Sequence, residues 1–464
     1  MEFIVSIVQS ASPQKPDDVV VSVAEATAGD VAKAARLARD AQRGWAAATP
    51  AERANALHAA ADAVAAAADG LTALAVREVG KPVAEARGEV ARSVAILRYY
   101  AQQVFDPVGA VHESSSGAGL AYTRRRPRGL TGLVTPWNFP LAIPLWKAAP
   151  ALAFGNGVLL KPAPQATASA LRLAELLTPH LPEGLLAVLP GDAEAGQAVI
   201  EASDVVSFTG SAAVGSIVAS AAAARGVPVQ CEMGGQNPSV VLPDVDVEAV
   251  ARQVAYAAFG YAGQKCTATK RVIVVGDAAR FADALVAATE ALVCGDPADP
   301  TTTVGPVIEQ GARDRVLDAS LGGAAAGGRV LTGGRAGTGA GWFVAPTIVD
   351  NLPVDHLLLR EEVFGPICAL TQVDSVADAL EAANNVRYGL AASVFTADLD
   401  AALRFADGSA AGQIKINAPT TGVDFYLPFG GERDSSLGPR EQGKAAQEFY
   451  TSLHTVTAAA PVRA

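Results

Sequence analysis

Residues 128–164 read RGLTGLVTPWNFPLAIPLWKAAPALAFGNGVLLKPAP, and this stretch decides the fold class. It holds two short apolar runs, GLV at 132–134 and GVLL at 157–160, separated by a segment long enough for a helix. Apolar runs in this spacing are typical of buried parallel strands joined by a helical crossover. The stretch therefore predicts a β–α–β unit within a parallel sheet.

The same alternation continues toward the C-terminus. Further apolar runs are found at 185–189, 205–208, 239–242, 271–275 and 391–395. Helical segments lie between them, so we expect two α/β domains that meet near residues 232–237.

The segment before this region has a different texture. Residues 22–105 are alanine-rich with a helical pattern, in which Thr49 predicts an N-cap followed by Pro50 at the first helical position. The sequence Gly-Lys-Pro at 80–82 predicts a break between two helices. We expect these helices to pack on the first α/β domain. Residues 322–341, rich in glycine and alanine, predict surface connections around a short strand.

Composition excludes several classes of protein. The 464 residues carry 36 basic and 47 acidic side chains, a formal net charge of −11, and 50% of them are hydrophobic. This apolar content argues against a disordered chain, and the net negative charge argues against nucleic-acid binding. The four cysteines and five histidines are scattered, so we expect no metal site.

The sequence also predicts a cytoplasmic protein without a membrane partner. The start, MEFIVSIVQS, has no basic residue of the kind that opens a signal peptide. The most apolar stretch, residues 141–160, contains Lys147 and Asn156 and is a poor membrane span.

Cys266 is the cysteine whose context favours chemistry. The preceding GYAGQK, at 260–265, supplies small residues that suit a loop approaching a ligand closely. A single cysteine can equally be a small buried hydrophobe, and we expect that of Cys294 and Cys368, which lie in apolar sequence.

Two further residues have a context that suits catalysis. Glu232 is followed by two glycines at the predicted domain junction, where a mobile carboxylate could act as a general base; the alternative is a surface or ion-paired glutamate. Asn138 lies in TPWNFP at 135–140, where prolines and aromatic residues make a rigid mount for an amide donor to an oxyanion; the alternative is a helix cap.

Two strand ends could contact a phosphate or a ribose. FTGSAAVG at 208–215 ends a strand and opens a helix, but its glycines are spaced more widely than in a dinucleotide fingerprint. Lys161 ends the strand of GVLLKP and could contact a ribose or phosphate.

Taken together and in this order, the motifs resemble those of the aldehyde dehydrogenase superfamily over essentially the whole chain. The matching motifs are TPWNFP at 135–140, LKP at 160–162, FTGS at 208–211, EMGG at 232–235, GQKC at 263–266, EEVFGP at 361–366, YGLAASVF at 388–395 and PFGG at 428–431. The resemblance implies an α/β fold with a Rossmann-like cofactor domain, an α/β catalytic domain and a β oligomerisation arm. The implied boundaries are 1–108 and 128–234 for the cofactor domain, 235–432 for the catalytic domain, and 109–127 and 433–464 for the arm.

The resemblance also implies catalytic roles. Cys266 would form a thiohemiacetal with an aldehyde, and the Asn138 side chain with the Cys266 backbone N–H would hold the oxyanion. Hydride transfer to a nicotinamide would leave a thioester, and Glu232 would activate the water that hydrolyses it. The implied cofactor-binding residues are Thr135, Trp137, Lys161, Pro164, Gly210, Ser211, Gly215, Glu362 and Phe364.

The cofactor could be NAD or NADP. NAD-preferring relatives usually carry a glutamate three residues after the lysine, whereas this chain has Pro164. Because no carboxylate there repels a 2′-phosphate, Pro164 favours acceptance of NADP.

The substrate is less defined than the reaction. PLWKAAPAL at 144–152 and SSLGPREQGKAAQEFYTS at 435–452 look most like the α-ketoglutarate semialdehyde (2,5-dioxopentanoate) dehydrogenase branch. The expected tunnel residues are apolar, which would also suit an alkyl or aryl aldehyde, and Arg433 is a candidate for holding a substrate acid. These expected tunnel residues are Ile143, Trp146, Val423, Phe425 and Phe429.

The implied partner is a second copy of the chain, through an arm that pairs residues 109–127 with the segment after Phe449. We expect a homodimer or homotetramer. The alternatives are a CoA-acylating enzyme of the same fold, which generally lacks the base at Glu232, a catalytically retired scaffold, and a cofactor-free cysteine hydrolase, for which no histidine lies near Cys266 in the sequence.

Overall fold

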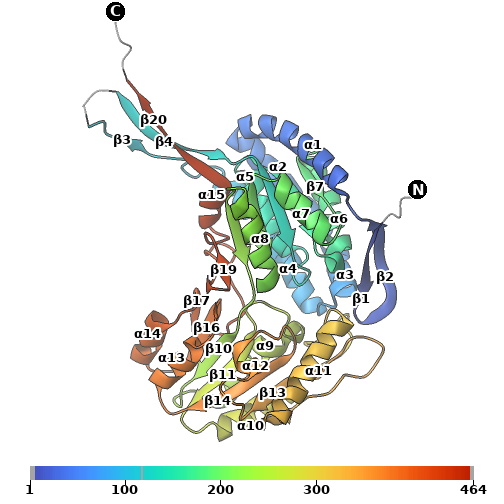
Figure 1. The fold of residues 1–464 in the computed structure, drawn as a ribbon, viewed down its shortest axis with the longest axis vertical. Coiled ribbons are helices and arrows are strands. Elements are labelled where there is room, and N and C mark those ends of the chain that lie inside the picture. The colour runs from blue at the N-terminus through green and yellow to red at the C-terminus, as the bar shows by residue number, and fades with distance from the viewer. Residues whose placement is uncertain (1–5, 116–118, 460–464) are drawn as a thin grey trace, which may run out of the picture.

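Two α/β lobes, each built on its own sheet, lie one above the other in the computed structural model, which describes residues 6–115 and 119–459 (Figure 1). The first lobe has a six-stranded sheet in the order β19-β9-β8-β5-β6-β7, in which β19 alone is antiparallel to its neighbour. Its strands are β5 (Leu130–Thr135), β6 (Gly157–Pro162), β7 (Leu186–Val188), β8 (Val205–Thr209), β9 (Val229–Glu232) and β19 (Ser436–Leu437).

The opening stretch of the sequence forms the unit predicted for it. β5 and β6 pair in parallel, from Leu130 beside Gly157 to Thr135 beside Pro162, and α5 (Ala142–Ala153) connects them. Every residue of α5 is buried, because the helix lies between this sheet and the N-terminal helices. The loop before α5 therefore leaves the carboxyl edge of the sheet, where ligands of such sheets bind.

The second lobe has a seven-stranded sheet in the order β12-β13-β14-β11-β10-β16-β17, parallel except at β12. Its strands are β10 (Asn237–Val241), β11 (Thr269–Val275), β12 (Arg329–Thr332), β13 (Thr347–Asp350), β14 (Ile367–Val373), β16 (Ala391–Phe395) and β17 (Gln413–Ile416). The chain passes from the first lobe to the second at residues 233–236, between β9 and β10, and returns to the first lobe at β19.

Helices cover both sheets. In the first lobe these are α1 (Ala28–Ala47), α2 (Pro50–Ala66), α3 (Ala68–Val79), α4 (Val83–Gln103), α6 (Thr167–Leu177), α7 (Ala193–Ala202), α8 (Ala212–Ala224) and α15 (Ala445–Tyr450). In the second lobe they are α9 (Val247–Phe259), α10 (Ala279–Glu290), α11 (Gln310–Ala325), α12 (Leu357–Arg360), α13 (Val376–Asn384) and α14 (Leu399–Gly408). The described part of the chain also contains three short 3₁₀ turns: η1 (Pro164–Ala166), η2 (Thr178–His180) and η3 (Gly260–Gly263).

The N-terminal helices begin and break as the sequence predicts. Thr49 caps α2 with a reciprocal hydrogen-bond pair to Glu52, and α3 ends at Gly80, whose φ of 65° favours glycine. The glycine-rich segment 322–341 differs in part from the predicted surface connections. Its first four residues, 322–325, belong to the end of α11, and β12 is the short strand within it. Cys368 is buried in β14, whereas Cys294 is exposed in a loop after α10, contrary to the expectation of burial.

Within residues 6–115 and 119–459 there are also three small sheets. β1 (Ile7–Ser12) and β2 (Lys15–Ala24) form an N-terminal hairpin, and β15 (Tyr388–Gly389) pairs with β18 (Glu432–Arg433). β3 (Val111–His112), β4 (Leu120–Pro127) and β20 (Thr451–Ala458) form a sheet in the order β20-β4-β3, which extends away from both lobes (Figure 1). We call this three-stranded sheet the arm.

The C-terminal part of the predicted arm also belongs to the first lobe. The segment 433–464 contributes β19 to the first lobe and α15 to its core before it reaches the arm. Parts of the predicted ranges, at 1–5, 116–118 and 460–464, lie outside the described residues.

Among the described residues, no single helix is long and apolar enough to cross a membrane. The consecutive helices α2 and α3, bent by 68° at their junction, meet the length and composition test as a pair.

Candidate active site

Cys266 follows a tightly wound loop. Tyr261, Ala262 and Gly263 have φ values of 57°, 53° and 64°, a left-handed run that non-glycine residues rarely adopt. A Cβ on Gly263 would lie 2.5 Å from the carbonyl oxygen of Gly365. The chain therefore holds the approach to Cys266 in one strained conformation, and the thiol itself is half-buried.

Hydrogen bonds from outside the loop fix its shape. Asn237, the first residue of β10, donates from Nδ2 to the carbonyl oxygens of Cys266 and Ala268, both at 2.8 Å. Lys270 Nζ donates to the carbonyls of Gly263 at 3.0 Å and Gly365 at 2.8 Å, and so joins this loop to the one that carries Glu362 and Phe364.

Asn138 lies against the same loop. Its Nδ2 donates to the carbonyl oxygen of Gln264 at 3.0 Å, two residues before Cys266, and the side chain is buried. A carboxamide nitrogen has two N–H donors, so a second remains for another acceptor. Asn138 does not cap the helix, since Glu89 Oε1 accepts from the backbone N–H groups of Leu141 and Ala142 at its start.

Glu232 ends β9 with its side chain buried in the first lobe. Ser436 Oγ donates to its Oε2 at 2.6 Å. Burial raises the pKa of the Glu232 carboxyl well above its usual value, and the nearby Glu441 carboxylate raises it further. The surface or ion-paired alternative therefore does not hold, and the group has the environment of a proton acceptor of increased basicity.

Glu441 belongs to a buried network that the sequence did not indicate. Lys147, on α5, forms an ion pair with Glu441 and donates to Ser207 Oγ at 2.7 Å. The two charged residues are 294 positions apart in the chain, so only the fold brings them together beside Glu232.

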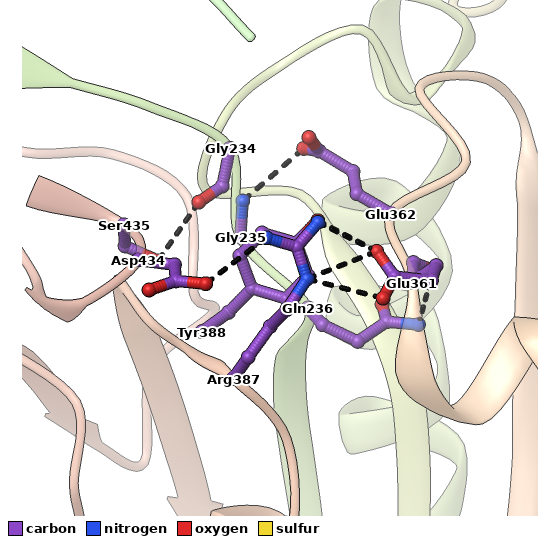
Figure 2. Close-up of polar contacts among 9 residues, drawn as sticks. All are labelled: Gly234, Gly235, Gln236, Glu361, Glu362, Arg387, Tyr388, Asp434 and Ser435. Atoms are coloured by element: carbon purple, nitrogen blue, oxygen red, sulfur yellow. Dashed lines mark hydrogen bonds and ion pairs between the residues drawn. The ribbon is translucent and has the colours of Figure 1, made fainter. Parts of the chain in front are cut away.

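The connection between the lobes is clamped on both sides (Figure 2). Ser435 Oγ donates to the Gly234 carbonyl at 2.8 Å, and the Gly235 N–H donates to Glu362 Oε1 at 3.3 Å. Gln236 Nε2 donates to the Glu361 carbonyl at 2.8 Å. The outer side of the clamp is an exposed cluster in which Arg387 pairs with Glu361 and Asp434.

The clamp places a second carboxyl group near the thiol. Burial raises the pKa of Glu362 to about 7, although Lys270 opposes the shift. Burial also raises the pKa of the Cys266 thiol to about 12, and Glu362 and Glu232 add to that effect. The backbone N–H groups of Thr267 and Cys266 act in the opposite direction, so amide donors surround the sulfur as well as carboxyl groups.

The predicted cofactor residues of the first lobe lie at the carboxyl edge of its sheet. Thr135 ends β5, Lys161 is the last residue but one of β6, and Gly210 follows β8. Ser211 caps α8, and a Cβ on Gly215 of that helix would lie 2.4 Å from the sulfur of Met233. Pro164 opens η1 just after β6.

These residues fit a nucleotide cofactor. The Oγ1 atoms of Thr135 and Thr209 are buried without a hydrogen-bond partner among the described residues, at the ends of neighbouring strands. The N-terminus of α8 offers backbone N–H groups suited to a phosphate. Trp137 and Phe364 pack edge to face, with ring centroids 5.7 Å apart, and link this edge to the Cys266 loop through Lys270.

Cys266 lines a cavity of about 370 Å³ between the lobes' loops. Trp146, Val423 and Phe429 line it as predicted. Ile143 does not, because it belongs to the buried core of the first lobe, and Phe425 packs on Tyr99 instead. Arg433 is also elsewhere, since its guanidinium donates to the carbonyls of Asn384 and Val386.

A larger cavity, of about 1030 Å³, lies apart from this chemistry. Lys15, Cys294 and Phe343 are among its lining residues, and it includes none of the predicted site residues. The smaller cavity is therefore the candidate active site, because the thiol opens into it.

Comparison with known proteins bears on what this site does. A model of the aldehyde dehydrogenase family matches residues 6–456. The chain belongs to this family. The resemblance inferred from the motifs is thereby confirmed, and so is the fold class.

Two similar proteins are both named as dehydrogenases of alpha-ketoglutarate semialdehyde. The alpha-ketoglutaric semialdehyde dehydrogenase of Bacillus subtilis is 41% identical, over 97% of this chain and 94% of that protein. The alpha-ketoglutarate semialdehyde dehydrogenase of Haloferax volcanii is 38% identical, over 96% and 94%.

Solved structures of aldehyde dehydrogenases have the same fold as this chain. The NAD-dependent aldehyde dehydrogenase of Sinorhizobium meliloti has a TM-score of 0.95 at 32% identity, covering 99% of this chain and 93% of that one. An NAD+ complex of an aldehyde dehydrogenase from Bacillus cereus has a TM-score of 0.94 at 32% identity, covering 98% and 93%. The protein is thus an NAD(P)-dependent aldehyde dehydrogenase that acts on an aldehyde.

Proposed function

We propose that Cys266 is the nucleophile of aldehyde oxidation and that Asn138 and Glu232 assist it in successive steps. The observation that carries this proposal is the position of the half-buried thiol, which lines the 370 Å³ cavity. Asn138 binds the carbonyl two residues before it, and the Glu232 carboxyl is near enough to raise its pKa. A nucleophile, an oxyanion donor and a base are the three groups that acyl transfer through a thioester requires.

In the first step, Cys266 loses its thiol proton to solvent and its sulfur bonds to the aldehyde carbon, while the carbonyl π bond breaks and the oxygen gains the negative charge. The free N–H of Asn138 and the backbone N–H of Cys266 stabilise that charge, because donors held by the surrounding chain need no reorientation. When bound, NAD(P) supplies the acceptor for the hydride that leaves this carbon.

In the second step, Glu232 takes a proton from water while the water oxygen bonds to the thioester carbon. The carbon–sulfur bond then breaks, Cys266 is regenerated and the acid is released. The raised pKa of Glu232 supports this role, since a carboxylate of increased basicity accepts a proton more readily. This step makes the product a free acid rather than an acyl-CoA.

For the cofactor, we propose that Thr135, Trp137, Lys161, Pro164, Gly210, Ser211, Gly215, Glu362 and Phe364 form the binding site. The absence of a carboxylate at Pro164 supports use of NADP as well as NAD. For the substrate, we propose a semialdehyde such as 2,5-dioxopentanoate, which the names of the two curated relatives support. Of the predicted pocket residues, Trp146, Val423 and Phe429 remain in this proposal.

We further propose that the enzyme is a cytoplasmic homodimer or homotetramer that assembles through the arm. Exposed apolar side chains on the arm, including Val111 and Leu453, support assembly. All four cysteines, each within the described chain, are unpaired, which supports a reducing compartment. The division into a cofactor domain, a catalytic domain and an arm stays part of the proposal.

Absorbance of the reduced nicotinamide tests the reaction. The purified protein is mixed with 2,5-dioxopentanoate, succinate semialdehyde, pentanal or benzaldehyde, each with NAD and with NADP. We expect reduction without CoA and formation of the free acid. The Cys266→Ala variant should lose turnover by at least about 1,000-fold, a loss typical of a missing nucleophile, yet still bind cofactor.

Other outcomes would redirect the proposal. Residual turnover near that of the unaltered enzyme in Cys266→Ala would remove Cys266 from the mechanism. Turnover only after CoA is added would indicate the acylating reaction, and cofactor binding with no turnover under either condition would indicate a retired scaffold.

A further inference from the structure

The cavity that contains Cys266 has one charged side chain whose charge is not matched by an ion pair. Four charged residues line it, namely Glu85, Glu89, Arg92 and Lys265. Each has a different set of partners, and those partners decide which charge is left for a ligand.

Three of these charges are already satisfied. Glu85 pairs with Lys265 and accepts from the Tyr256 hydroxyl at 2.8 Å. Glu89 is fully buried, where it pairs with Lys81 and accepts from two backbone N–H groups at the start of α5. Neither carboxylate needs a ligand, and Lys265 has its counterion.

Arg92 is different. It makes no ion pair within 4.0 Å among residues 6–115 and 119–459, and its Nη2 donates to the Val423 carbonyl oxygen. Its Nε is buried and has no hydrogen-bond partner in that part of the chain. Asp424 and Glu89 are the carboxylates whose charges act on Arg92. Asp424, however, is exposed and accepts from the Tyr426 hydroxyl at 3.1 Å, and Glu89 is paired with Lys81.

Two more polar groups of the same cavity are unsatisfied. Both amide atoms of Gln442 and the Nε1 of Trp146 are buried without partners among the described residues. Gln442 and Trp146 line the cavity together with Arg92 and Cys266. A buried polar group without a partner is rare and costly, so a ligand that completes these bonds would be favoured.

We propose that Arg92 and Gln442 bind a carboxylate of the substrate while Cys266 attacks its aldehyde group. This proposal rests on the proposed function and narrows it to aldehydes with an anionic end. The guanidinium offers paired donors that match the two oxygens of a carboxylate, and no carboxylate of the described residues lies within 4.0 Å of it. The apolar walls, Trp146 and Phe429, suit the short chain between the two ends of such a molecule.

The positions along α4 explain how Arg92 is held. Glu89 lies one turn earlier on the same helix face, where it anchors α4 to the start of α5. The Val423 carbonyl, in a segment distant in sequence, then accepts a hydrogen bond from the guanidinium. A rigid cation can select among substrates without moving, because its orientation is set before the ligand arrives.

The test compares a charged and an uncharged aldehyde of similar length, 2,5-dioxopentanoate and pentanal. In Arg92→Gln, we expect the ratio of their kcat/KM values to fall by about 100-fold, as for a lost charged hydrogen-bond partner. Arg92→Lys should show a smaller fall of about 10-fold, because it keeps the charge but loses the fork. Gln442→Leu should lower the ratio in the same direction.

Arg87 supplies the matched control. It is an exposed arginine on the same helix and lines a separate cavity, so Arg87→Gln should leave the ratio unchanged. Equal losses on both aldehydes in Arg92→Gln would overturn the proposal and indicate that Arg92 only holds the Val423 loop. If Arg92→Gln does not fold, Arg92→Lys and Gln442→Leu decide by the same ratio.

A second measurement separates this proposal from the reaction itself. Glutarate, a dicarboxylate without an aldehyde, should slow alkylation of Cys266 by iodoacetamide in the unaltered enzyme but not in Arg92→Gln. This readout needs no turnover, so protection without aldehyde oxidation would support the carboxylate site and contradict the proposed reaction. Oxidation without protection would contradict the carboxylate site alone.

Discussion

At the scale of single residues, Glu232 is buried, yet its proposed role as a base requires the ionised carboxylate. Its pKa is raised by burial and by Glu441, yet it must be ionised to accept a proton from water. We therefore expect the steady-state rate to rise as the pH increases above 4.5, the ordinary pKa of such a carboxyl, because Glu232 then loses its proton. Glu232→Gln should give a burst of reduced nicotinamide and then a steady-state rate about 100-fold lower than that of the unaltered enzyme. Stopped-flow absorbance measures both phases. An unchanged steady rate would contradict the assignment of Glu232 as the base.

The same raised pKa has a consequence for stability. The folded protein keeps the Glu232 proton at pH values where the unfolded chain, with a pKa near the ordinary 4.5, has lost it. Stability from this group is therefore greatest at low pH and falls as pH rises above about 4.5. Glu232→Gln cannot lose a proton, so its free energy of unfolding relative to the unaltered enzyme should increase between pH 5 and pH 8.

Urea unfolding at pH 5, 6.5 and 8 measures this difference. The expected gain is at most about 1.4 kcal/mol per pH unit, the linkage value for one proton. A difference that stays constant over the three pH values would mean that the pKa of Glu232 is not raised.

Pro164 bears on cofactor choice. It opens η1 directly after β6, where its carbonyl accepts from Thr167 Oγ1 at 3.0 Å. Pro164→Glu would add a carboxylate close to the proposed ribose site, and NADP binding should weaken about 10-fold more than NAD binding because of like-charge repulsion. Cofactor fluorescence titration measures both constants. Pro164→Ala, which adds no charge, is the control, and equal effects on NAD and NADP would contradict the proposed ribose site.

At the scale of elements, the left-handed turn before Cys266 determines where the nucleophile lies. A Cβ on Gly263 would lie 2.5 Å from the backbone oxygen of Gly365 and 2.6 Å from that of Ala258. Backbone atoms cannot move away from such a contact without a large cost in free energy. Gly263→Ala should therefore lower the free energy of unfolding by about 3 kcal/mol, the left-handed penalty plus overpacking. It should also change the alkylation rate of Cys266.

Gly226 provides the control for this prediction. Its φ of 66° is nearly that of Gly263, but a Cβ there would meet no atom within 4 Å. Gly226→Ala should cost only about 1 kcal/mol, the left-handed penalty alone, and leave Cys266 alkylation unchanged. Equal costs for the two variants, measured by urea unfolding, would show that the close approach in the Cys266 loop is unimportant.

The elements also show how far sequence reasoning reached. Strand runs, the Thr49 cap and the break at Gly80 follow from local patterns, and the structure has them because each depends on a few neighbouring residues. The Lys147–Glu441 pair and the unpaired Arg92 could not be predicted in this way. Their meaning depends on contacts between distant segments, which no local pattern records.

The sequence also did not show which residues of a buried helix face the cavity. Ile143 and Trp146 both belong to α5, which is buried on all sides, so burial pattern alone does not tell which residue faces the cavity. Trp146 lines it and Ile143 packs in the core. The distinction arises from how α5 packs against α4, a tertiary property.

At the scale of the whole molecule, the arm is fixed at its base and open at its far edge. Arg128 Nε donates to the Phe449 carbonyl at 2.6 Å, and Asn156 Nδ2 donates to that of Tyr450 at 3.0 Å, so β20 leaves the first lobe in a set direction. β20 pairs with β4 on one side only, and its other edge has no strand partner within the described chain. An open edge strand is a template for pairing with another chain.

Leu453 tests whether the arm joins copies of the enzyme. It lies on β20 with 56% of its surface exposed, while Leu321 on α11 is 66% exposed and remote from the arm. If the arm is the interface, Leu453→Asp buries an unpaired charge and should weaken association by about 100-fold or more. Light scattering after size-exclusion chromatography should then give a lower mass than for the unaltered enzyme. Leu321→Asp makes the same change outside the proposed interface and should keep the full mass. A monomeric mass for the unaltered enzyme, or an equal loss in both variants, would contradict assembly through the arm.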